Sequence, residues 1–117
     1  MAPERSSGPL GRVSISTDAI AQIAGFVASE CFGVVGTAAR GGMVGRFLLG
    51  NAPERGIEVL QTDRGLVITL HVVVERGLNL SEVAATVRSR VAYEVGRQTG
   101  LAVASVDVHI GDVRAAP

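Results

Sequence analysis

Two histidines and one aspartate are the residues of this 117-residue sequence best suited to acid–base or metal chemistry. His71 and His109 fall on the polar faces of two predicted strands, and Asp107 shares a face with His109. Imidazole nitrogens and a carboxylate could form a His–Asp pair or a small metal cluster if the two strands were neighbours. No spacing in the sequence enforces that proximity. We therefore interpret both histidines as solvated strand residues, and expect no metal site and no catalytic residue.

Cys31 is the single cysteine, which excludes an internal disulfide framework and any multi-cysteine metal site. It lies on the apolar stripe of a predicted helix, so we expect a buried core residue rather than a catalytic thiol, which needs an exposed, electropositive setting. All 11 basic residues are arginine, and without lysine no phosphate-binding P-loop is possible. A dinucleotide-binding fingerprint is also absent. We expect no enzyme activity, no cofactor and no small-molecule substrate.

Two glycine motifs leave nucleic-acid binding open as an alternative. Gly33-Val-Val-Gly36 and Gly42-Met-Val-Gly45 both fit the GxxG loop with which KH domains clamp a nucleic-acid backbone. The formal net charge of zero argues against such a ligand. A KH-like module would use Gly42 and Gly45, with Arg40 and Arg46 as the nearby cations.

An apolar cluster lies inside the irregular segment 37–56. This cluster could fold onto the core, form a surface for a protein partner or self-association, or touch a membrane beside nearby arginines. The mean hydropathy of +0.36 is high for a small domain and favours a surface that is covered. The cluster consists of Met43, Val44, Phe47, Leu48 and Leu49.

The predicted elements follow from periodicity and capping signals. Alternation predicts strands at 12–16, 57–61, 66–75 and 102–110, the second and third forming a hairpin around residues 62–65. A helix begins at about Thr17, capped by Ser16 or Thr17, and ends by Gly33 and Gly36; Phe26 falls off its apolar stripe. A second helix runs from an Asn79 cap to Gly100.

Strand alternation divides the predicted sheet into an apolar face and a mixed face. Ile68, Leu70, Val72 and Val74 share the apolar face, which belongs on the core. The mixed face is open or faces a partner. Its hydrophobic residues are Val67, Val73 and Val103.

The element order β-α-β-β-α-β, with two amphipathic helices and one clean apolar sheet face, predicts an α+β two-layer sandwich with both helices on one face. We expect a single domain over residues 11–113, with flexible tails at 1–10 and 114–117. The N-terminus lacks the apolar core of a secretory signal, and residues 19–39 are too rich in glycine and alanine around Glu30 to span a membrane. A cytoplasmic location is the default.

Several segments then resemble the alkaline shock protein family, also called the envelope stress response proteins. The resemblance covers residues 11–113. An aromatic residue is usual in the family at the position of Arg76, and asparagine is common at that of Asp107. The similar segments are Gly11-Arg-Val-Ser-Ile-Ser16, Gly33-Val34, Gly77-Leu-Asn-Leu-Ser-Glu-Val83, Thr99-Gly-Leu101 and Val106-Asp-Val108.

The resemblance implies a non-enzymatic cytoplasmic protein that sits at the inner face of the membrane through a membrane-anchored partner and serves cell-envelope homeostasis. It carries over no catalytic residue. We therefore expect an interaction module that binds such a partner or associates with itself. The expected surfaces are the Met43–Leu49 cluster and the mixed sheet face at Val67, Val73 and Val103.

Overall fold

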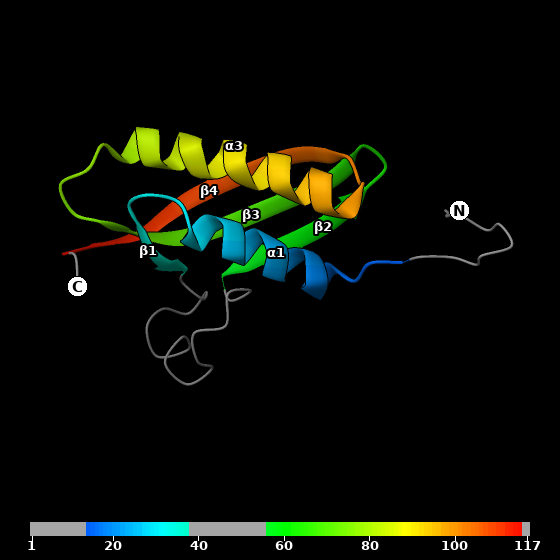
Figure 1. Cartoon of the computed structure of the whole chain (residues 1–117), viewed down its shortest axis with the longest axis horizontal. Helices are drawn as coiled ribbons and strands as arrows, with labels where there is room; N and C mark the ends of the chain where they lie inside the picture. The colour runs from blue at the N-terminus through cyan, green and yellow to red at the C-terminus, as the bar shows by residue number, and fades with distance from the viewer. Residues whose placement is uncertain (1–13, 38–55, 116–117) are drawn as a thin grey trace, which may run out of the picture.

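The computed structural model describes residues 14–37 and 56–115 of the chain. These residues form two helices and a four-stranded sheet, with both helices lying over the same face of the sheet (Figure 1). The predicted α+β fold is therefore confirmed. In chain order the elements are α1 (Thr17–Ser29), β1 (Val34–Thr37), β2 (Ile57–Thr62), β3 (Gly65–Glu75), α3 (Leu80–Thr99) and β4 (Val103–Arg114).

Of the four strands in the described part of the chain, only β3 pairs with all the others. β2 pairs antiparallel with its first half and β1 antiparallel with its last residues, so these two short strands share one edge of β3. β4 pairs along the other edge and is parallel to β3. Parallel neighbours need a crossover connection, and α3 supplies it. The sheet is therefore mixed, with β3 at its centre.

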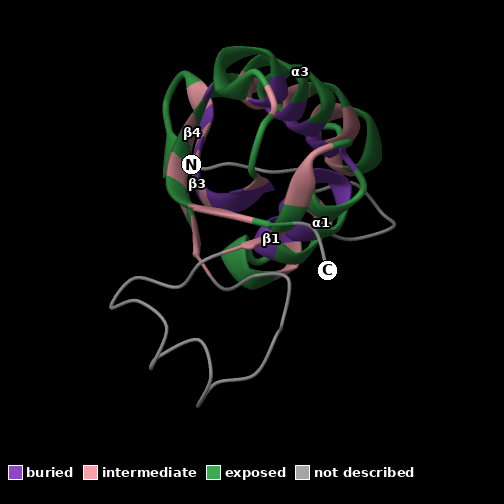
Figure 2. Cartoon of the chain, turned by 90° about the vertical axis from the view of Figure 1, so that its left-hand side faces the viewer, coloured by how far each residue is buried: buried purple, intermediate pink, exposed green. Residues whose placement is uncertain are grey.

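The core is aliphatic and lies between the helices and the sheet (Figure 2). Alternate residues of β3 from Leu66 to Val74 project into it, together with Ile20 and Ala24 of α1. On α3 the buried residues recur every four positions, at Val83, Val87, Val91 and Val95. Each such side chain contributes roughly 1.5–3 kcal/mol when fully buried.

Capping side chains mark the starts of both helices, and a glycine marks the end of α3. Ser16 caps α1, its hydroxyl accepting a hydrogen bond from the Ala19 N–H at 3.1 Å. Asn79 caps α3 in the same way, accepting from the Glu82 N–H at 3.1 Å. Gly100 ends α3 in the left-handed conformation with φ 75°, which glycine adopts without steric cost. The predicted helix starts are thus confirmed.

The predicted first strand is corrected by the structure. Ser14–Ser16 are not in a strand, and residues 12 and 13 lie outside the described residues. A strand forms instead at Val34–Thr37, where we expected only the end of the helix. Gly33, with φ 92°, reverses the chain directly after α1, and its carbonyl accepts the Glu75 N–H at 2.8 Å. The backbone pairing that β3 makes available at its far end therefore decides the conformation of this short segment.

Val103 lies on the core face of the sheet, not on the mixed face as expected. Leu66 pairs with Val103, but Val67 pairs with Ser105, so Ala104 is an extra residue on β4. Such a bulge shifts the alternation of side chains by one position. Val103 therefore packs against the core, while Ala104 is exposed.

Alanine substitution of Gly65, compared with that of Gly36, tests how closely the start of β3 packs against the start of β4. Gly65 has φ 126°, and a Cβ there would lie 2.7 Å from the Ala102 carbonyl oxygen; Gly36 has neither constraint, with no described atom within 4 Å of such a Cβ. Gly65→Ala should lower the free energy of unfolding by about 2 kcal/mol or more. Gly36→Ala should change it by less than about 0.5 kcal/mol. Urea unfolding measures both, and equal midpoints for the two variants would contradict the proposed packing at Gly65.

Candidate interaction surfaces

The sheet face that points away from the helices, called here the open face, carries the two histidines. His71 of β3 and His109 of β4 are register partners, and their rings stack with centroids 5.1 Å apart and an interplanar angle of 18°. The parallel pairing of the two strands creates the proximity that the sequence could not establish. Asp107 lies opposite Thr69 instead. Among residues 14–37 and 56–115, no three potential metal ligands gather at one point.

The predicted hydrophobic residues of the open face are mostly unavailable. Val73 is only 1% exposed, Val103 lies on the core face, and Val67 is half-buried. Leu60 of β2, which sequence patterning did not single out, lies opposite Val67 and is 65% exposed. The open face is therefore a largely polar surface with one exposed leucine.

The residues of the segment between β1 and β2 that we expected to bind a partner lie outside the described residues. The same holds for the second GxxG motif and its two arginines. The first motif, Gly33 to Gly36, forms a turn and the start of β1, and Gly36 pairs with Val73. It is not a free loop that could clamp a phosphate backbone, so the structure lends the KH-like alternative no support. The undescribed residues are Arg40, Gly42, Met43, Val44, Gly45, Arg46, Phe47, Leu48 and Leu49.

Exposed aromatic side chains distinguish the helical layer. The described part of the chain contains three aromatic residues, and all of them are exposed: Phe26 by 59%, Phe32 by 78% and Tyr93 by 67%. Aromatic rings are normally the largest contributors to a hydrophobic core, and exposed ones mark interaction surfaces. The sequence contains one indication of these exposed rings, which is the position of Phe26 off the apolar stripe of α1.

A groove of about 650 Å³ runs between α1 and α3 on this layer. Ala19, Ile23 and Phe26 give it an apolar strip along α1, flanked by Gln22 and, just after the helix, Glu30. The opposite wall, from α3, carries Arg90, Glu94 and Arg97. This combination of apolar contact area and arginine is characteristic of protein-binding surfaces.

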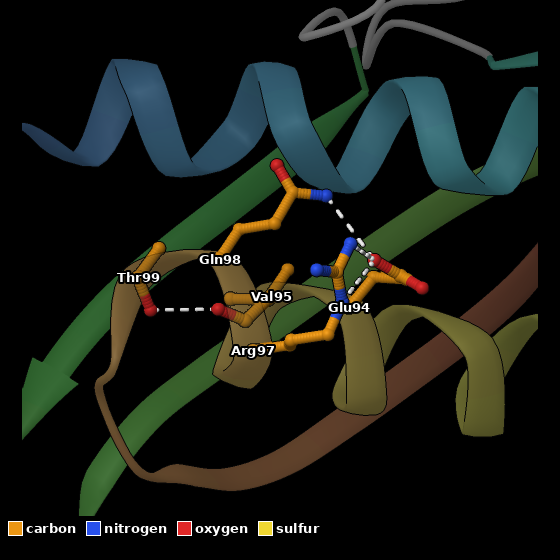
Figure 3. A network of polar contacts seen from close by, with 5 residues as sticks. All are labelled: Glu94, Val95, Arg97, Gln98 and Thr99. Atoms are coloured by element: carbon orange, nitrogen blue, oxygen red, sulfur yellow. Dashed lines mark hydrogen bonds and ion pairs between the residues drawn. The ribbon is translucent and has the colours of Figure 1, made fainter.

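The charges on the α3 wall are fixed by hydrogen bonds (Figure 3). One carboxylate oxygen of Glu94 accepts from Arg97 Nη2 at 2.7 Å, from Arg97 Nε at 3.1 Å and from Gln98 Nε2 at 3.2 Å. The hydrogen bonds from Arg97, and then that from Gln98, lower the pKa of Glu94. Arg90 has no ion-pair partner among the described residues. Arg90 nevertheless acts on Glu94 at longer range, since its charge helps to lower the pKa of that carboxyl.

Cys31 is buried, as expected, below the end of α1. Its thiol donates a hydrogen bond to the Val27 carbonyl oxygen at 3.4 Å, and burial raises its pKa. A protonated thiol inside the core is not a nucleophile. The expectation of a buried core cysteine is confirmed.

Comparison with known proteins then identifies the class of this chain. The model of the alkaline shock protein 23 family, described by its cell envelope-related function, matches residues 5–115. The uncharacterized protein YloU of Bacillus subtilis is 35% identical over 107 residues, which are 89% of each chain. The uncharacterized protein Spy1614 of Streptococcus pyogenes is 31% identical over 107 residues, 89% of this chain and 88% of that one.

A third relative, the uncharacterized protein YqhY of Bacillus subtilis, is 35% identical over 86% of this chain and 76% of its own length. No solved structure matches the chain. The chain therefore belongs to the alkaline shock protein 23 family, a family with a cell envelope-related function. Within the described residues, neither helix has the length and hydropathy needed to cross a bilayer.

The Glu94 contacts predict a specific titration. Arg97→Gln should raise the pKa of Glu94 toward its ordinary value of 4.5 because the strongest hydrogen bonds to the carboxylate are lost. Because the native pKa is lowered, the contribution of this contact to stability is present above the unfolded-state pKa and is lost as the pH falls through the native one. Carboxyl ¹³C NMR titration measures the shift.

Arg88→Gln is the control for this titration, since Arg88 lies on the same helix, is exposed and makes no contact with Glu94. It should leave the Glu94 pKa unchanged. An equal pKa in the native protein and in Arg97→Gln would show that the hydrogen bonds in Figure 3 do not hold in solution.

Proposed function

We propose that the chain is a non-enzymatic interaction module that binds a membrane-anchored protein through the groove between α1 and α3, and that also associates with itself. Its place would be the cytoplasm, at the inner face of the membrane, in the maintenance of the cell envelope. The observation that carries this proposal is the exposed Phe26 ring, 59% accessible, on the groove between α1 and α3 of a domain whose core is aliphatic. The family's cell envelope-related function supports it.

The groove has the composition of a binding hot spot. Aromatic residues and arginine supply most of the energy at protein interfaces, because they bury large areas and form directional hydrogen bonds. Phe26 provides an exposed ring on the apolar strip, and Arg90 provides a guanidinium without an ion-pair partner among the described residues. The complementary segment would present an apolar side chain to Phe26 and a carboxylate to Arg90.

The charge balance of the groove favours a protein over a lipid surface. Anionic membranes attract clusters of basic residues. Here Arg90 and Arg97 line the groove together with Glu30 and Glu94, so the groove as a whole is close to neutral.

Substitution of Phe26 tests this proposal. Phe26→Asp should leave the fold intact, because the side chain is exposed, but weaken partner binding about 30-fold or more, as expected for a hot-spot aromatic. The fraction of the protein that sediments with membranes of the producing cells measures the effect. Photo-crosslinking from position 26 should give one discrete adduct with a membrane protein.

Ser89→Asp is the matched control, since it adds the same charge to an exposed position of α3 that does not line the groove. It should sediment and crosslink as the native protein does. If Phe26→Asp, verified as folded by circular dichroism, still sediments like the native protein, the groove is not the partner site.

A further inference from the structure

Strand β4 has one edge that no described residue pairs. It extends over 12 residues, from Val103 to Arg114, and its only strand partner within residues 14–37 and 56–115 is β3. An unpaired edge presents backbone N–H and C=O groups that can pair with another strand. Bulges interrupt β4 near Ala104 and near Gly111, so the regular run between them is residues 105–110.

The hydrogen bonds of β3 show which β4 residues direct their backbone outward. His71 and Glu75 donate to Gly56 and Gly33, so odd-numbered residues of β3 bond toward β1 and β2. Even-numbered residues therefore bond toward β4, as the Leu66 bond to Ala102 at 2.9 Å shows. In a parallel ladder, the backbone groups of each even-numbered β3 residue form hydrogen bonds with the two residues that flank its register partner on β4. The backbone groups of Val106, Val108 and Ile110, which are the register partners, thus point to the free edge.

We infer that β4 pairs antiparallel with β4 of a second copy, about a twofold axis at Val108. This inference rests on the self-association in the proposed function and specifies the surface through which two copies associate. The register places Val108 opposite Val108 and Val106 opposite Ile110, all with outward backbone groups, which supplies about six hydrogen bonds. The twofold symmetry makes the contact closed and limits it to a dimer.

Hydrogen-bond complementarity between side chains selects this register over its neighbours. On the open face it places Asp107 opposite His109 of the second copy, twice per dimer, which are favourable cross-strand pairs. An axis at position 107 would oppose two aspartates, and an axis at 109 would oppose two histidines. An axis at 106 would place Asp107 opposite a serine and leave it without an imidazole partner. Only the axis at Val108 pairs every Asp107 with an imidazole.

The dimer would also give the stacked histidines a role. His71 and His109 form a continuous row with Asp107 of the second copy across the shared sheet. A carboxylate beside an imidazole fixes the orientation of its ring by accepting a hydrogen bond. The helices of both copies remain on the same side of the joined sheet, so each groove stays accessible.

A charge swap across the axis tests the pairing by sedimentation velocity over a range of concentrations. The native protein should show a monomer–dimer equilibrium. Asp107→His and His109→Asp should each weaken the dimer at least about tenfold, because like residues then face each other. The double variant Asp107→His/His109→Asp restores opposite pairs and should return the dissociation constant to within a few-fold of the native value. A purely structural role for either residue would not produce this rescue.

A disulfide provides an independent readout of the axis. In Cys31→Ala, Val108→Cys should form a covalent dimer on mild oxidation, because residue 108 faces itself across a hydrogen-bonded pair of suitable Cα separation. Ser105→Cys in the same background, which does not face itself, should remain uncrosslinked. If the native protein is a dimer but the swaps do not weaken it and Val108→Cys forms no disulfide, the β4 pairing is wrong while self-association stands. A strictly monomeric native protein overturns both and leaves the groove proposal untouched.

Discussion

Strand β3 is the structural constraint on which the rest of the molecule depends. Its alternate residues from Leu66 to Val74 form the floor of the core, and its two edges hold every other strand. Burial of its backbone requires a partner for each N–H and C=O group, so β1, β2 and β4 are recruited along its length. The helices cover only one side of β3, so the other side forms the open face. Because β4 pairs with β3 along one edge, its other edge is left on the outside of the sheet.

The division between core and surface follows from side-chain size. Two helices laid on a small sheet leave room for valine, alanine, leucine and isoleucine in the close-packed interior. The described aromatic residues are instead displayed on the helical layer, where Phe26 borders the groove and Phe32 a smaller hollow at the start of α3. The few aromatic residues are therefore the distinctive feature of the described surface.

Local signals in the sequence were sufficient for both helix starts, the Gly100 end of α3 and the hairpin, because these depend on residues close together in the chain. They failed where the local conformation depends on backbone pairing between segments that are distant in the sequence. The valines of β1 form a strand only because β3 offers an edge, and the bulge that turns Val103 inward depends on the register of β4. The stacking of His71 on His109 has the same origin. The groove joins residues about 60 or more positions apart, which no local pattern could bring together.

The central claim is that the groove between α1 and α3 is where a membrane-bound protein docks. Hydrogen–deuterium exchange, compared between the purified protein alone and the protein bound to membranes of the producing cells, tests it directly. The account predicts slower exchange of backbone amides in α1 and in the second half of α3 when bound, with β2 unchanged. Membrane-bound protein whose helices exchange as fast as in the free protein, or whose protection is confined to the sheet, would contradict the claim.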